Sequence, residues 1–126
     1  MAANNIGALA VVEQHGDTDV IGIFSERDYL HKIAALNKDH TKTTIREVAT
    51  IGATDLVIVE HDELIEGCME KMLSRGIRHL LVRQDSVVTG MISVKDVVVC
   101  AHLKETGVVT TRIEEPDNLT MCMATC

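Results

Sequence analysis

Apolar and polar stretches alternate along the first third of the chain in a pattern that predicts a hairpin followed by a helix. Continuous apolar runs over residues 6–12 and 20–24 predict two buried strands joined by a polar turn. A helix is expected to begin at Ser25, and one apolar stripe recurs on it at helical spacing. The stripe consists of Tyr29, Leu30, Ile33 and Ala34. Residues 37–44 are polar throughout and indicate a linker, and residues 45–48 predict a short turn of helix.

The rest of the chain predicts a strand, a helix, a second hairpin and a last helix. Strands are expected at residues 56–59, 77–82 and 87–92, and the last helix from Ser93 to about Lys104. The middle helix should begin with Asp62 as N-cap and end at Gly76, which suits the left-handed C′ position. Its apolar stripe consists of Leu64, Ile65, Cys68, Met69, Met72 and Leu73. Beyond Gly107 the periodicity ends, so a loosely ordered tail is expected there.

Two heptapeptides in this chain share one pattern, which indicates an internal repeat. Gly22-Ile-Phe-Ser-Glu-Arg-Asp28 matches Gly90-Met-Ile-Ser-Val-Lys-Asp96 at an offset of 68 residues, and the strands before them match at an offset of 71. The repeated unit is strand–helix–strand–strand–helix. Its second copy opens at Leu56, whereas the first copy lacks its opening strand and most of its first helix.

Composition narrows the possible functions. The chain has one Phe, one Tyr and no Trp, and its net charge is −7, so it lacks the aromatic platforms and the positive field of nucleic-acid-binding modules. The four cysteines form no dense framework, which favours a reducing, intracellular compartment, and no apolar run is long enough to span a bilayer. The six histidines show no metal-ligand spacing and no serine lies in a nucleophile elbow, so we expect no catalytic activity and no metal.

The two heptapeptides resemble the CBS domain, which occurs in tandem pairs called Bateman modules. Residues 76–82 also resemble a strand signature of this family, and the resemblance covers about residues 4–104 apart from the linker. More narrowly, residues 5–12 and 24–33 resemble small stand-alone CBS-pair proteins of plants and bacteria. The resemblance implies an α+β fold of tandem β-α-β-β-α repeats about a pseudo-twofold axis, the first repeat truncated at its N-terminus. We expect that repeat over 1–37, a linker over 38–50, the second repeat over 51–106 and a tail over 107–126.

The Ser-x-x-Asp motif has two interpretations. Ser93 and Asp96 have the spacing of a capping box, which stabilises a helix by roughly 1 kcal/mol and needs no ligand. Alternatively, the free amides and positive dipole of a helix N-terminus receive a phosphate, and the carboxylate accepts hydrogen bonds from ribose hydroxyls. The resemblance implies the second role for Asp96, with Ser93 as a phosphate or ribose ligand.

Other residues complete the candidate site by resemblance. Lys95 could neutralise a phosphate, and otherwise it is a solvated charge. Arg78, His79 and Leu80 would meet the base or phosphate, the alternative being an exposed Arg and a half-buried His. Thr50 would lie on the wall around the adenine. A weaker second site would consist of Ser25, Arg27 and Asp28.

The resemblance implies a regulatory role. It predicts a homodimer that senses AMP or another adenosine ligand, requires no cofactor, and signals occupancy to a regulated enzyme or a thioredoxin-type protein. The alternatives are a ligand-free dimerisation module and the regulatory fragment of a larger enzyme. The expected location is cytoplasmic or organellar, including the mitochondrion if a targeting segment has been lost. Cys122 and Cys126 could bind a metal or form a disulfide, although a structural role is the simpler interpretation.

Overall fold

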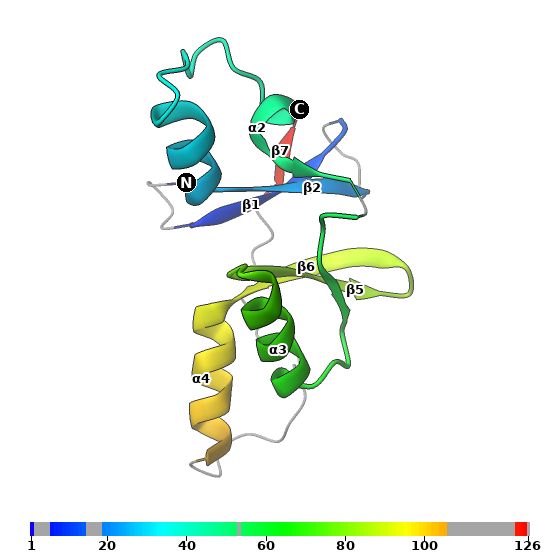
Figure 1. Ribbon diagram of the computed structural model, residues 1–126. Helices are drawn as coiled ribbons and strands as arrows, with labels where there is room; N and C mark the ends of the chain where they lie inside the picture. Colours follow the sequence, from blue (N-terminus) through cyan, green and yellow to red (C-terminus); the bar gives the residue numbers. More distant parts are fainter. Residues whose placement is uncertain (2–5, 15–18, 53, 106–122, 126) are drawn as a thin grey trace. The chain divides into compact units, whose positions relative to one another are not determined.

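The computed structural model describes residues 1, 6–14, 19–52, 54–105 and 123–125 (Figure 1). The chain divides into two compact units, residues 1–56 with 121–126 and residues 57–120. Both units combine a small β-sheet with helices, as the sequence predicts for an α+β fold. Cys122, Cys126 and most of the expected tail over 107–126 lie outside the described residues.

The first unit contains a sheet with the strand order β3-β2-β1-β7. The hairpin of β1 (Ala8–Val12) and β2 (Val20–Ser25) is confirmed. The short strands are β3 (Thr50–Ile51), which is antiparallel to β2, and β7 (Met123–Thr125), which is parallel to β1. β3 and β7 are the described strands that the sequence pattern did not predict, because strands of two and three residues carry too little apolar pattern.

The helical part of the first unit begins with one α-helical turn and continues as a π-helix. α1 (Glu26–Asp28) leads into η2 (Tyr29–Ala34), and the predicted turn α2 (Ile45–Val48) follows the polar linker. Ile33 packs with Val11, Phe24 and Val48 in the core of this unit. The predicted stripe is otherwise wrong, since Tyr29, Leu30 and Ala34 are exposed. π-Helical hydrogen bonds join residues five apart, so side chains spaced for an α-helix do not share one face.

The second unit contains the three-stranded sheet β4-β5-β6 and two helices. Its elements are β4 (Ile58–Glu60), α3 (Ile65–Arg75), β5 (His79–Gln84), β6 (Val87–Ser93) and α4 (Val94–Glu105). β4 is parallel to β5, and β5 is antiparallel to β6. α3 and α4 pack side by side against this sheet (Figure 1). The buried core consists of Val59, Ile65, Cys68, Met72, Leu80, Val82, Ile92 and Val97.

Helix α3 confirms one predicted boundary and corrects the other. Gly76 ends it with φ +62°, a left-handed conformation that glycine adopts without a Cβ penalty. The N-cap is Leu64 rather than Asp62, and no side chain caps this end. Met69 and Leu73 are exposed although they lie in the predicted stripe, because only one side of the helix faces the sheet.

The two hairpins confirm the repeat. Ala8 pairs with Ser25 in the first unit as His79 pairs with Ser93 in the second, which reproduces the offsets of 71 and 68 residues. Both registers shift at corresponding points, after Val11 and after Val82. The sequence pattern therefore predicted the tandem α+β architecture correctly.

Candidate functional site

Ser93 and Asp96 form a reciprocal cap at the start of α4. Asp96 Oδ2 accepts hydrogen bonds from the Ser93 backbone N–H at 2.7 Å and from the Ser93 hydroxyl at 2.6 Å. Ser93 Oγ in turn accepts a longer bond, 3.4 Å, from the Asp96 N–H. The other carboxylate oxygen, Asp96 Oδ1, accepts no hydrogen bond from the described residues. The capping interpretation is therefore correct, and it leaves one charged acceptor at an exposed helix N-terminus.

The same cap occurs twice more, so the cap by itself does not mark a ligand site. Ser25 and Asp28 make the three corresponding bonds at 2.9, 2.7 and 3.3 Å. Thr44 and Glu47 also form a capping box, at the start of α2. Any functional distinction of Asp96 must come from its neighbours.

The neighbours of Ser93 lie at the start of β5. His79 pairs directly with Ser93 across the sheet, and the Val94 N–H donates to the Arg78 carbonyl at 2.9 Å. Arg78 is exposed and His79 is half-buried. The structure thus brings a carboxylate, a hydroxyl, an imidazole and a guanidinium to one end of the second unit's hairpin. A phosphorylated ribose needs acceptors for its hydroxyls and donors for its phosphate, which these groups include.

The corresponding place in the first unit is chemically different. Gly7 and Ala8 stand where the second unit has Arg78 and His79, and the Gly7 carbonyl accepts the N–H of Glu26 at 3.0 Å. No charged side chain or imidazole faces Ser25 from these positions, because neither residue carries one. The first hairpin therefore has the same backbone pairing as the second but lacks the guanidinium and imidazole groups at these two positions.

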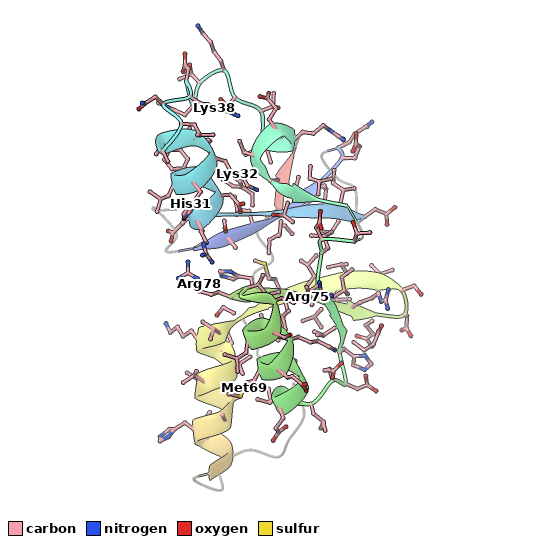
Figure 2. The ribbon with its side chains drawn as sticks, viewed as in Figure 1. His31, Lys32, Lys38, Met69, Arg75 and Arg78 are labelled. Carbon is pink, nitrogen blue, oxygen red and sulfur yellow. The ribbon has the colours of Figure 1, made fainter. Side chains whose placement is uncertain are left out.

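Lys32 pairs with Oδ1 of Asp28, the carboxylate oxygen that does not take part in the cap. Its Nζ lies 2.7 Å from Asp28 Oδ1 and donates to the Val48 carbonyl at 2.8 Å, so it joins η2 to α2 (Figure 2). Burial raises the pKa of Asp28, but hydrogen bonds from Lys32 and Ser25 outweigh it and hold that pKa below its ordinary value. This contact of Lys32 was not predicted from the sequence, although Asp and Lys four residues apart on a helix are a known stabilising pair. At an offset of 68, the second unit has Cys100 at this position.

The other residues predicted for the ligand site lie in positions less favourable for contact with a ligand beside Asp96. Leu80 is fully buried in the core, so only its backbone could meet a ligand. Lys95 and Arg27 are exposed on the first helical turns. Thr50 belongs to the first unit, where β3 pairs it with Ile23. Among the described residues, no group of three or more His, Cys, Asp or Glu side chains could hold a metal. No helix in the described ranges is long and apolar enough to cross a membrane.

The chain belongs to the CBS domain family, whose model matches residues 1–35 and 43–102. It is 34% identical over 98 residues to the CBS domain-containing protein CBSX3, mitochondrial, of Arabidopsis thaliana, covering 78% of this chain and 47% of that protein. The chain thus spans about half the length of this curated relative. A solved protein with CBS domains from Burkholderia ambifaria is 32% identical, with a TM-score of 0.71 and coverage of 90% of this chain and 76% of that one.

Two further solved structures hold ligands that contain adenosine. The CBS domain pair of protein MJ0100, in complex with 5′-methylthioadenosine and S-adenosyl-L-methionine, is 25% identical, with a TM-score of 0.64 and coverage of 82% and 76%. The CBS domain protein PAE2072 of Pyrobaculum aerophilum, complexed with AMP, is 23% identical, with a TM-score of 0.68 and coverage of 86% and 79%. The second likeness shows the fold alone.

Proposed function

We propose that this chain is a regulatory CBS pair that binds an adenosine-containing ligand at the second unit and has no catalytic activity of its own. The observation that carries the proposal is the difference between the two repeats. In the described part of the chain no donor bonds to Oδ1 of Asp96, whose cap lies beside Arg78 and His79, whereas Lys32 pairs with Oδ1 of Asp28. The adenosine ligands of the MJ0100 pair support the choice of ligand class.

Each group at the second unit has a role in this proposal. Asp96 Oδ1 accepts a hydrogen bond from a ribose hydroxyl, while Oδ2 remains in the cap. The N-terminus of α4 and the Ser93 hydroxyl favour the phosphate, since backbone amides and the helix dipole attract an anion there. Arg78 and Lys95 add positive charge, and AMP is the first candidate because it carries both a ribose and a phosphate.

The signal would pass to a partner protein by a shift in population. A ligand changes the balance between two conformations only by the difference in its affinity for them. A partner that recognises the ligand-bound conformation, such as a regulated enzyme or a thioredoxin-type protein, would then respond to the AMP concentration. Binding of the partner should in turn strengthen AMP binding by the same factor, because coupling between two sites is reciprocal.

We also propose that the chain works as a homodimer through the second unit. Both helices of this unit expose apolar side chains on the surface that does not pack on the sheet. These are Leu64, the N-cap of α3, Met69 and Leu73 on α3, and Val94, Val98 and Val99 on α4. Leu73 is 79% exposed and Val98 56%. An apolar surface of this kind commonly marks a protein–protein contact. Sedimentation should show a dimer for the natural chain and a monomer for Leu73→Glu combined with Val98→Glu. A dimer that survives both changes would contradict this contact.

The rival function is a dimerisation module that binds no ligand. The three capping boxes favour it, because capping a helix is a structural role that needs no ligand. The melting temperature of the full chain, measured with increasing AMP, ATP or S-adenosylmethionine, distinguishes the two functions. A ligand at 100 times its Kd stabilises the folded state by about 2.7 kcal/mol. An unchanged melting temperature with all three ligands would favour the rival.

A further inference from the structure

The first unit takes the last strand of its sheet from the far end of the chain. β7 pairs in parallel with β1, and the partners are Ala10 with Met123, Val11 with Ala124 and Val12 with Thr125. Figure 1 draws β7 in red, within the first unit. About a hundred residues of chain therefore separate two strands that share one ladder.

The second unit has a strand in the same place, but that strand comes from the repeat itself. β4 pairs in parallel with β5, and the partners are Ile58 with Leu81, Val59 with Val82 and Glu60 with Arg83. β4 directly precedes the segment that leads into α3, so it is the opening strand of the repeat.

The two parallel ladders correspond residue for residue. Subtracting the repeat offset of 71 from Leu81, Val82 and Arg83 gives positions 10, 11 and 12, which are the three residues that β7 pairs with. In each unit, the register shift of the hairpin also falls within these three residues, between Val11 and Val12 or between Val82 and Arg83. We infer that residues 123–125 act as a surrogate opening strand, which completes the first repeat in the register that β4 has in the second.

The burial of β1 agrees with this role. Ala10 and Val11 are 0% exposed and Val12 is 1% exposed, as expected for a central strand rather than an edge. Without β7, β1 would present a row of unpaired backbone groups along the sheet edge. Residues 123–125 thus cover this edge of the sheet, and their pairing with β1 determines whether the edge is open to another strand.

Disulfide cross-linking in the full chain tests the register directly. Cys122 and Cys126 are first replaced by Ser, and Cys68 and Cys100 by Ala, so that no natural thiol competes with the introduced pair. Ala10→Cys is then combined with Met123→Cys, its partner in the ladder, or with Thr125→Cys as the matched control two residues out of register. Glutathione disulfide is the oxidant, so two protein thiols become one disulfide and two molecules of glutathione are released.

The register predicts a clear difference between the two pairs. The Ala10–Met123 pair should form an intrachain disulfide at least ten times faster than the control pair, since a disulfide needs Cα atoms within about 7 Å. Equal rates for the two pairs, or a disulfide that joins two chains, would overturn the inference. No deletion is needed, so loss of folding cannot imitate the expected result.

Hydrogen exchange provides the second test. Successive residues of β1 point their amides alternately toward β2 and away from it. Deleting residues 121–126 should speed exchange at least tenfold for the amides that point away from β2, and leave the alternate amides protected. A synthetic peptide of residues 119–126, with Ser at 122 and 126, should restore protection when added. Unchanged exchange after the deletion would show that β1 does not depend on this strand.

Discussion

Replacing Lys32 by Met tests how much the contacts of Lys32 with Asp28 and Val48 stabilise the first unit. The ammonium group makes two contacts, an ion pair with Asp28 and a hydrogen bond to the Val48 carbonyl. Methionine keeps a similar apolar stem and removes only the charge and the donors. The substitution therefore leaves Asp28 with its bonds to Ser25 alone and removes the link from η2 to α2.

The expected loss of stability follows from the exposure of the two partners. The Lys32 side chain is 41% exposed and that of Asp28 is 14% exposed, so solvent screens the ion pair in part. A partly screened pair contributes about 0.5–1 kcal/mol. The bond to Val48 adds about 1 kcal/mol, because its carbonyl would otherwise lose its donor. We expect Lys32→Met to lower the free energy of unfolding of the first unit by about 1.5–2 kcal/mol at pH 7.

Tyrosine fluorescence during urea unfolding measures this loss in the right unit. Tyr29 is the only tyrosine and the chain has no tryptophan, so the signal reports the helix that carries Lys32. Lys38→Met is the matched control, since Lys38 is exposed and makes no side-chain hydrogen bond or ion pair among the described residues. It should change the free energy of unfolding by less than about 0.5 kcal/mol.

The pH dependence gives a second check on the same variant. The pKa of Asp28 is lower in the folded protein than its ordinary value of about 3.9. The stabilisation by the ionised carboxylate is therefore present above about pH 4 and is lost as the pH falls through the folded value. The difference between the natural chain and Lys32→Met should shrink at the lowest pH, leaving the part due to Val48. A Lys32→Met variant as stable as Lys38→Met at pH 7 would mean that the two contacts of Lys32 do not stabilise the first unit.

Two other predictions concern packing. Gly22→Ala should destabilise the first unit by about 1–3 kcal/mol in urea unfolding, because a Cβ there would lie 2.7 Å from the Thr50 backbone oxygen; unchanged stability would contradict the close approach of β3. Val97→Ala should lower the free energy of unfolding by about 2 kcal/mol, since Val97 is 1% exposed. Val98→Ala, at a position that is 56% exposed, should cost the monomer less than about 0.5 kcal/mol; equal losses in the monomer would mean that α4 faces the sheet differently.

The sequence predicted the parts of the fold that depend on local pattern. Both hairpins, the repeat and the glycine that ends α3 follow from apolar runs, offsets and a left-handed cap. The π-helical hydrogen bonds of η2 were not predictable, because its apolar residues have ordinary α-helical spacing. The strand β7 was missed because three residues carry too little pattern, and their pairing depends on β1 at the other end of the chain.

The candidate site likewise has a part that the sequence predicted and a part that it did not. The Ser-x-x-Asp spacing predicted both caps, which depend only on residues three apart. It could not distinguish Asp28 from Asp96, since that difference comes from groups outside the motif. Lys32 reaches the first carboxylate from the next helical turn, and β5 places Arg78 and His79 beside the second motif through sheet pairing. The role of each residue toward a ligand stays a prediction.

Calorimetric titration of the full chain with AMP, comparing Asp96→Asn with Asp28→Asn, distinguishes a ligand site at the second unit from one at the first. Asparagine can keep the cap through its carbonyl oxygen, while the free acceptor of Asp96 becomes an amide donor. The proposed site predicts that Asp96→Asn weakens AMP binding at least tenfold at an unchanged melting temperature without ligand, and that Asp28→Asn binds AMP like the natural chain. Equal binding by both variants, or a loss confined to Asp28→Asn, would contradict a site at the second unit.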